Sequence, residues 1–163
     1  MKKRRPTIPL FLWKLAVNTE STKQIQNHSS SPAHNCECEW CLLWRNQVEE
    51  LLPDTIKEQL LRIGIDLNRP SELYKFGQDI DHYSMRVIYH LVGKVLSGPI
   101  QRIDKDGDKF LTYQTVRKIP YFSLNVIPEK QSLEYCPKLN DSSAGDVIIV
   151  DFRLDVPNKA LLS

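Results

Sequence analysis

The spacing of the apolar residues changes near Asn68, and this change restricts the fold classes open to the chain. Before it, apolar residues recur at three- and four-residue steps, the spacing of one helix face: Cys41, Trp44, Val48, Leu51 and Leu52. After it, apolar and polar residues alternate as on a half-buried strand. Helices followed by strands, without a strand–helix–strand rhythm, indicate an α+β fold. We expect an N-terminal helical hairpin packed on an antiparallel β-sheet of about five strands.

Two helices are expected in this hairpin. The first ends at Pro53, which interrupts the helical spacing. The second begins just beyond it, because Thr55 and Glu58 have the spacing of a capping box, and it ends where Gly64 allows a left-handed cap. The short connection predicts that the two helices pack against each other.

The second half of the chain contains the expected strands. The stretch from Met85 to Leu96 is apolar on both sides and is bounded by Gly98 and Pro99, which predicts a central strand. The cleanest alternation comes near the end of the chain, and one face of this last strand is expected in the core. Its apolar members are Ile148, Val150, Phe152, Leu154 and Val156.

The first 35 residues differ from the rest in charge and composition. They carry a net charge of +5, whereas residues 36–163 carry −3. The basic start followed by apolar residues imitates a secretory signal, but Pro9 and Lys14 interrupt the run and no cleavage site follows. We therefore expect a basic, then Ser-rich flexible arm over residues 1–35 and a single α+β domain over residues 36–163.

Charge and hydropathy also restrict the partners and the location. No segment approaches the roughly 20 consecutive apolar residues of a membrane span, so we expect a cytoplasmic protein. The acidic balance of residues 36–163 provides no excess positive charge for nucleic-acid phosphates. Binding to nucleic acid or to a membrane surface is an alternative for the basic arm alone.

Three of the four cysteines fall within six residues, as Cys36-Glu-Cys-Glu-Trp-Cys41. At the start of a helix this spacing can turn three sulfurs toward one point, and zinc binds such thiolates in structural sites. His34 and His90 are alternatives for the fourth ligand. A thiol redox pair also stays open, as does a bland interpretation in which Cys41 is only a small buried residue. The predicted ligands of a structural zinc are Cys36, Cys38, Cys41 and Cys136.

No motif of a known catalytic type occurs in the chain. A nucleophile elbow, a phosphate-binding loop and a metalloprotease helix are all missing from the sequence. His82 and His90 share one strand face, but at roughly 27 Å they are too far apart to share a small site. We therefore predict a non-enzymatic protein, with a small thiol-dependent enzyme as the alternative.

Four segments of the chain resemble a group of small, functionally uncharacterised bacterial proteins. The segments are Cys36-Glu-Cys-Glu-Trp-Cys41, the hairpin segments Leu51-Leu-Pro53 and Gly64-Ile-Asp66, Tyr89-His-Leu-Val-Gly93, and Phe152-Arg-Leu-Asp-Val-Pro157. In size and architecture the chain also looks like the immunity proteins that accompany bacterial toxins. By analogy, this likeness implies a bacterial protein that binds another protein, and it carries no catalytic residue over.

The leading hypothesis is therefore a protein-binding module that neutralises a basic toxin domain by covering its active site. An acidic face would attract such a partner. The residues expected on this face are Asp104, Asp106, Asp108, Asp151 and Asp155. A zinc-stabilised adaptor domain is the alternative. Trp40 and Trp44, one helical turn apart, are either a partner-binding anchor or part of the core.

Overall fold

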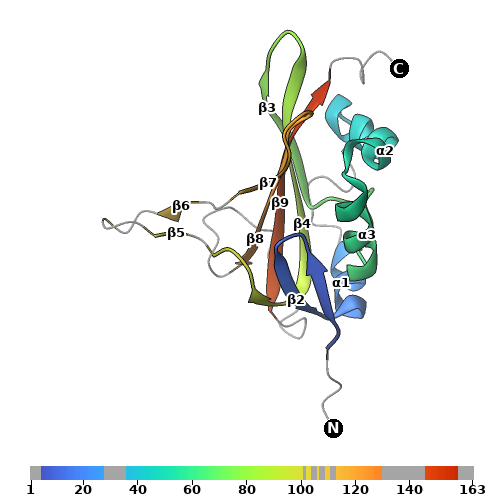
Figure 1. The fold of residues 1–163 in the computed structure, drawn as a ribbon. Helices are drawn as coiled ribbons and strands as arrows, with labels where there is room; N and C mark the ends of the chain where they lie inside the picture. The colour runs from blue at the N-terminus through green and yellow to red at the C-terminus, as the bar shows by residue number, and fades with distance from the viewer. Residues whose placement is uncertain are drawn as a thin grey trace.

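The computed structural model describes residues 5–27, 36–100, 102–103, 106, 109–110, 113–129 and 146–157. Within these ranges, three helices lie along one face of a seven-stranded antiparallel sheet (Figure 1). The predicted α+β class is confirmed, and the described strands outnumber the five that we expected. None of the helices in these ranges is long and apolar enough to cross a membrane.

The elements follow one another in an order that begins with strands. The helices are α1 (Thr19–Gln26), α2 (Glu39–Leu51) and α3 (Asp54–Ile63). The sheet strands are β1 (Thr7–Leu10), β2 (Trp13–Val17), β3 (Glu72–Gln78), β4 (His82–Ser97), β7 (Gln114–Arg117), β8 (Phe122–Pro128) and β9 (Val147–Pro157). A separate pair, β5 (Arg102–Ile103) and β6 (Lys109–Phe110), projects on the side of the sheet away from the helices (Figure 1).

Strand β4 organises the sheet. It pairs along most of its length with β9, from His82 opposite Pro157 to Val92 opposite Val147. On its other side, β3 pairs with its first half and β2 with its end. The strand order is β1-β2-β4-β9-β8-β7, with β3 as a second neighbour of β4. The predicted central strand is confirmed.

The core lies between the sheet and the helices. The five apolar residues predicted for the core face of the last strand are all buried in β9, which confirms that alternation. Trp44 of α2 donates its indole N–H to the hydroxyl of Tyr89 on β4, at 3.0 Å. The odd-numbered residues of β4 therefore face the helices. Because Trp44 is fully buried, the anchor interpretation is wrong for this residue and the core interpretation is confirmed.

The N-terminal segment is not a flexible arm over residues 5–27. Strands β1 and β2 form a hairpin that joins the sheet, with Ile8 opposite Leu15 and Leu10 opposite Trp13. Apolar residues of both strands are buried, and α1 follows at once, capped by Asn18, which accepts from the N–H of Ser21 at 3.0 Å. The apolar run that imitates a signal sequence is thus two short strands. The Ser-rich part of the predicted arm, residues 29–32, lies outside the described residues.

Helices α2 and α3 form near the predicted positions but not as the predicted hairpin. Helix α2 packs on β3, whereas α3 packs on β1, so the two follow one another along the sheet (Figure 1). Gly64 adopts the left-handed conformation, with φ of 96°, and ends α3 as expected. The capping box does not form, because Pro53 occupies the N-cap position of α3 and Thr55 lies within the helix.

We predict that Gly93→Ala destabilises the protein, because the backbone of the paired strand β2 lies very close to β4 at this position. A Cβ atom on Gly93 would lie 2.2 Å from the carbonyl oxygen of Ala16, so the backbone of β2 must move. We expect a loss of about 3 kcal/mol in the free energy of unfolding, measured in urea. Gly77→Ala on β3 is the matched control, because its Cβ would meet Ser84 at an ordinary 3.5 Å. Equal stability of the two variants would contradict the prediction.

Candidate functional site

The described cysteines gather at the start of α2. The sulfur atoms of Cys36, Cys38 and Cys41 all lie within 4.8 Å of one another. Cys38 is the N-cap residue of α2 and Cys41 belongs to its first turn. The N–H of Cys38 donates to the sulfur of Cys36 at 3.5 Å, and the Arg45 guanidinium donates to the Cys36 carbonyl oxygen. These contacts fold the preceding chain back onto the helix, so the three sulfurs form a group that can bind a metal ion.

The three sulfurs have different surroundings. Cys38 is exposed, whereas Cys41 is only 3% exposed. Burial is the largest single effect and raises the pKa of Cys38, but hydrogen bonds from the Cys41 amide, from the Cys36 and Cys41 side chains and from the Trp40 amide together lower it, and the net shift is downward. Burial, followed by the neighbouring sulfurs of Cys36 and Cys38, raises the pKa of Cys41 to about 12. A bound cation would favour the thiolate form of Cys41.

Only part of the predicted ligand set is placed together. Cys36, Cys38 and Cys41 meet as expected, while Cys136 and His34 lie outside the described residues. His90 is not near the cysteines. It lies on the sheet face turned away from α2, where its Nδ1 is 2.6 Å from the Ser71 hydroxyl, so the expectation of His90 as an alternative ligand is wrong.

The side chain of Trp40 connects the cysteine segment to the β3–β4 hairpin. Its ring lies 4.9 Å from the ring of Tyr83 on β4, and the ammonium group of Lys75 on β3 lies 4.8 Å above it. A cation held over an aromatic face contributes about 0.5–1 kcal/mol at an exposed site. The sequence contained no sign of this contact, because its partners lie more than 30 residues from Trp40. The position of the cysteine segment is therefore coupled to that of the hairpin.

A second cluster of charged groups is buried on the opposite face of the sheet. Arg86 of β4 holds Asp151 of β9 through two donors, with Nε 3.0 Å from Oδ1 and Nη2 2.5 Å from Oδ2. Tyr113 also donates its hydroxyl to Asp151 at 2.5 Å, and Arg86 donates to Tyr74 at 2.6 Å. Burial and the nearby Asp151 carboxylate both raise the pKa of Tyr113. Because Arg86, Asp151 and Tyr113 are hydrogen-bonded to one another or to Tyr74, we interpret this cluster as structural.

The predicted acidic docking face does not form as expected. Asp151 is 1% exposed and is bound by Arg86, so its inclusion in that face is wrong. Asp155 is half-buried and accepts from Ser84 at 3.0 Å, with Nε2 of His82 3.3 Å from its second oxygen. Asp106 is exposed, and Asp104 and Asp108 lie outside the described residues.

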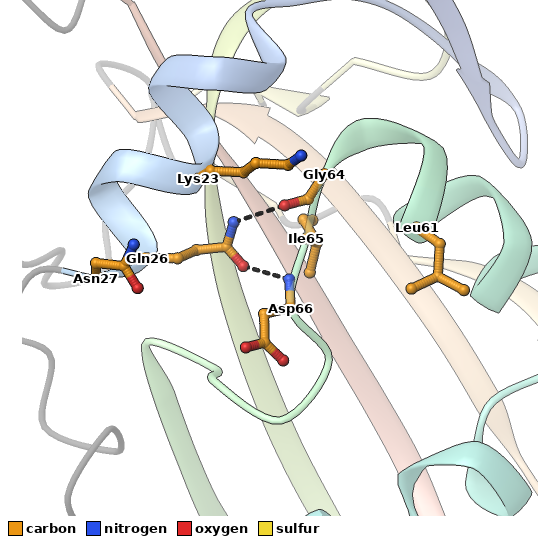
Figure 2. A pocket seen from close by; sticks show the side chains of 7 residues that line it. All are labelled: Lys23, Gln26, Asn27, Leu61, Gly64, Ile65 and Asp66. Atoms are coloured by element: carbon orange, nitrogen blue, oxygen red, sulfur yellow. Dashed lines mark hydrogen bonds between the residues drawn. The ribbon is translucent and has the colours of Figure 1, made fainter.

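The structure also has a hollow of about 370 Å³ between α1 and the end of α3 (Figure 2). Gln26 bridges its two walls, since its amide donates to the Gly64 carbonyl at 3.0 Å and accepts from the Asp66 N–H at 2.5 Å. Lys23 and Asp66 contribute opposite charges at its rim. No nucleophile paired with a base lines this hollow among the described residues. We interpret the hollow as part of the contact between α1 and the end of α3, which the hydrogen bonds of Gln26 hold together.

Comparisons with protein-family models, with curated proteins and with solved structures found no match for this chain. The resemblance drawn from four sequence segments therefore stays a prediction.

We predict that Asp151→Ala destabilises the protein far more than Asp155→Ala. Both residues lie on the same face of β9, but removal of Asp151 leaves the buried Arg86 cation without its bidentate partner. Breaking a buried pair in this way costs about 3–5 kcal/mol, whereas loss of a half-exposed carboxylate costs about 1 kcal/mol or less. Urea unfolding of both variants tests this difference. A similar decrease in the free energy of unfolding for the two variants would contradict the prediction, because burial of the Arg86–Asp151 pair would then not determine how much it stabilises the protein.

Proposed function

We propose that the protein is a zinc-stabilised adaptor domain in which Cys36, Cys38 and Cys41 are ligands of a structural zinc ion. The observation that supports this proposal is the approach of the three sulfurs to within 4.8 Å at the start of α2. Thiolates are the usual ligands of structural zinc, and zinc sites of this kind join segments that have little core of their own. Residues 36–38, which precede α2, are such a segment, because they are half-buried or exposed.

Structural zinc takes four ligands, so the proposal requires one more. Cys136 is our candidate, because it is the only other cysteine of the sequence. Its position is outside the described residues, and its role is tested by substitution below.

The proposed ion would stabilise more than one turn of helix. It would tie the chain before α2 to the first turn, and the contacts of Trp40 with Lys75 and Tyr83 would extend this effect to the β3–β4 hairpin. Zinc would thus hold the hairpin against α2. A surface held in this way suits an adaptor, because less conformational entropy is lost when a partner binds.

We predict that the reduced protein binds one equivalent of zinc and that zinc raises its melting temperature. At a free zinc concentration one hundred times Kd, the stabilisation is about 2.7 kcal/mol. For a chain of this size that is a rise of roughly 5–10 °C. Cys36→Ser and Cys38→Ser should abolish the rise, as should Cys136→Ser if it is the fourth ligand. Elemental analysis and thermal unfolding with and without a chelator provide the measurements.

Glu37→Gln and Glu39→Gln are the matched controls for these substitutions. Both carboxylates flank the cysteines and are exposed, so their loss should leave the zinc content unchanged. Reduced protein with no bound zinc, or with a melting temperature insensitive to zinc, would contradict the proposal.

Binding of another protein is the second proposal, and a specific surface favours it. The β3–β4 hairpin projects beyond the rest of the sheet (Figure 1). It carries Phe76, which is 51% exposed, and Ile80, which is 92% exposed, together with the exposed ring of Tyr74. Exposed aromatic residues are enriched in protein interfaces. The turn of the hairpin also carries Asp79 and Asp81, both exposed, so the surface combines apolar and acidic groups.

We predict that a photoreactive residue at position 76 forms specific crosslinks to a partner protein in the source cells. A photoreactive residue at position 61 is the matched control, because Leu61 is 56% exposed but lies on α3. Gel analysis should show adducts from position 76 that are missing from position 61. Identical adduct patterns at the two positions would contradict a docking role for the hairpin.

A further inference from the structure

The three sulfurs of the cysteine segment differ in solvent exposure, and this difference points to a reaction other than metal binding. Cys38 is exposed at the N-cap position of α2, whereas Cys41, three residues later, is buried. An exposed sulfur can meet an external disulfide, while a buried sulfur can react only with a neighbour. This is the division of roles that thiol–disulfide exchange requires, with one attacking and one resolving thiol.

The geometry decides which two cysteines can form a bridge. From the radius and rise of an α-helix, Cα atoms three residues apart lie about 5 Å from each other. This separation falls within the range of about 4.4–6.8 Å found for disulfides. The sulfurs of Cys38 and Cys41 are within 4.8 Å, so a change of side-chain rotamer can bring them into bonding contact. Cys36 and Cys38 have a single residue between them, and a bridge between them would strain the chain.

We infer that Cys38 and Cys41 form a dithiol–disulfide pair that exchanges with small-molecule disulfides. The Cys38 sulfur attacks one sulfur of the external disulfide, forming a mixed disulfide and releasing the first thiolate. The Cys41 sulfur, after giving up its proton, then attacks the Cys38 sulfur and releases the second thiolate. The protein dithiol loses two electrons, the external disulfide gains them, and the two protons end on the two released thiols.

The exchange would also control the metal site, and this part rests on the proposed function. Oxidation converts two of the three clustered thiolates into a disulfide, which is a poor ligand for zinc. Cys36 would then be the single thiolate left at the start of α2. The ion should therefore leave when the bridge forms and return when the bridge is reduced.

The test uses metal-free protein carrying Cys136→Ser, so that the clustered cysteines are its only thiols. Oxidised glutathione is the probe disulfide. We expect two glutathione thiols released per chain and a Cys38–Cys41 bridge by peptide mapping. Cys41→Ala should stop at one glutathione bound to Cys38. Cys38→Ser should slow the reaction at least about tenfold, whereas Glu37→Gln, at an exposed neighbouring position, should change it by less than about twofold.

Differential alkylation of the unsubstituted reduced protein gives a second measurement, which does not depend on the folding of any variant. Cys38 should be alkylated before Cys41, because its side chain is exposed. A bridge between Cys36 and Cys38, no bridge at all, or equal reactivity of all three thiols would overturn the inference.

Zinc binding and thiol–disulfide exchange can be measured independently of each other. Zinc binding by the reduced protein without exchange would overturn the inference and leave the proposed function intact. Exchange in a protein that binds no zinc would support the dithiol pair and contradict the proposed function. When both hold, oxidised glutathione should release zinc to a chromophoric chelator, with one ion for each bridge formed, and a reductant should reverse the release.

Discussion

The pairing of β4 with β9 determines which side of the sheet every other element uses. Adjacent residues of a strand point to opposite faces, so this one register places Val87 and Phe152 under the helices and Arg86 and Asp151 on the opposite face. A shift of one residue would turn one strand over relative to the other, so that either Arg86 or Asp151 would lie against the apolar helix faces, away from its partner. The bidentate bond of Arg86 to Asp151 therefore matters for register as well as for stability.

The cysteine segment depends on the same register, although it lies outside the sheet. Tyr83 belongs to the helix-facing set of β4, and Trp40 packs on it from α2. This contact fixes the first turn of α2, and the backbone contacts of Cys36 then bring the third sulfur to the other two. The geometry of the site is thus local in sequence, but its position on the sheet depends on residues more than 30 positions away.

The sequence could predict those features that depend on interactions between residues close together in the chain. The buried face of β9, the left-handed cap at Gly64 and the grouping of the three cysteines depend on near neighbours, and all three are present. The β1–β2 hairpin was missed because Pro9 and Lys14 interrupt an apolar run, although both are exposed positions of strands. The burial of Asp151 depends on Arg86, 65 residues earlier, and sequence spacing contains no sign of that pairing.

The exposure of Cys38 bears on how the two proposed chemistries can coexist. A zinc site whose ligands are all buried resists oxidation, because an external disulfide cannot reach any sulfur. A site with one exposed sulfur is accessible to attack, and the buried Cys41 then completes the exchange from within. The ion would protect the thiolates while it is bound, so exchange should be fastest when zinc is scarce. The structural order at the start of α2 would then depend both on the zinc concentration and on the oxidation state of the thiols, because the same three cysteine side chains take part in both.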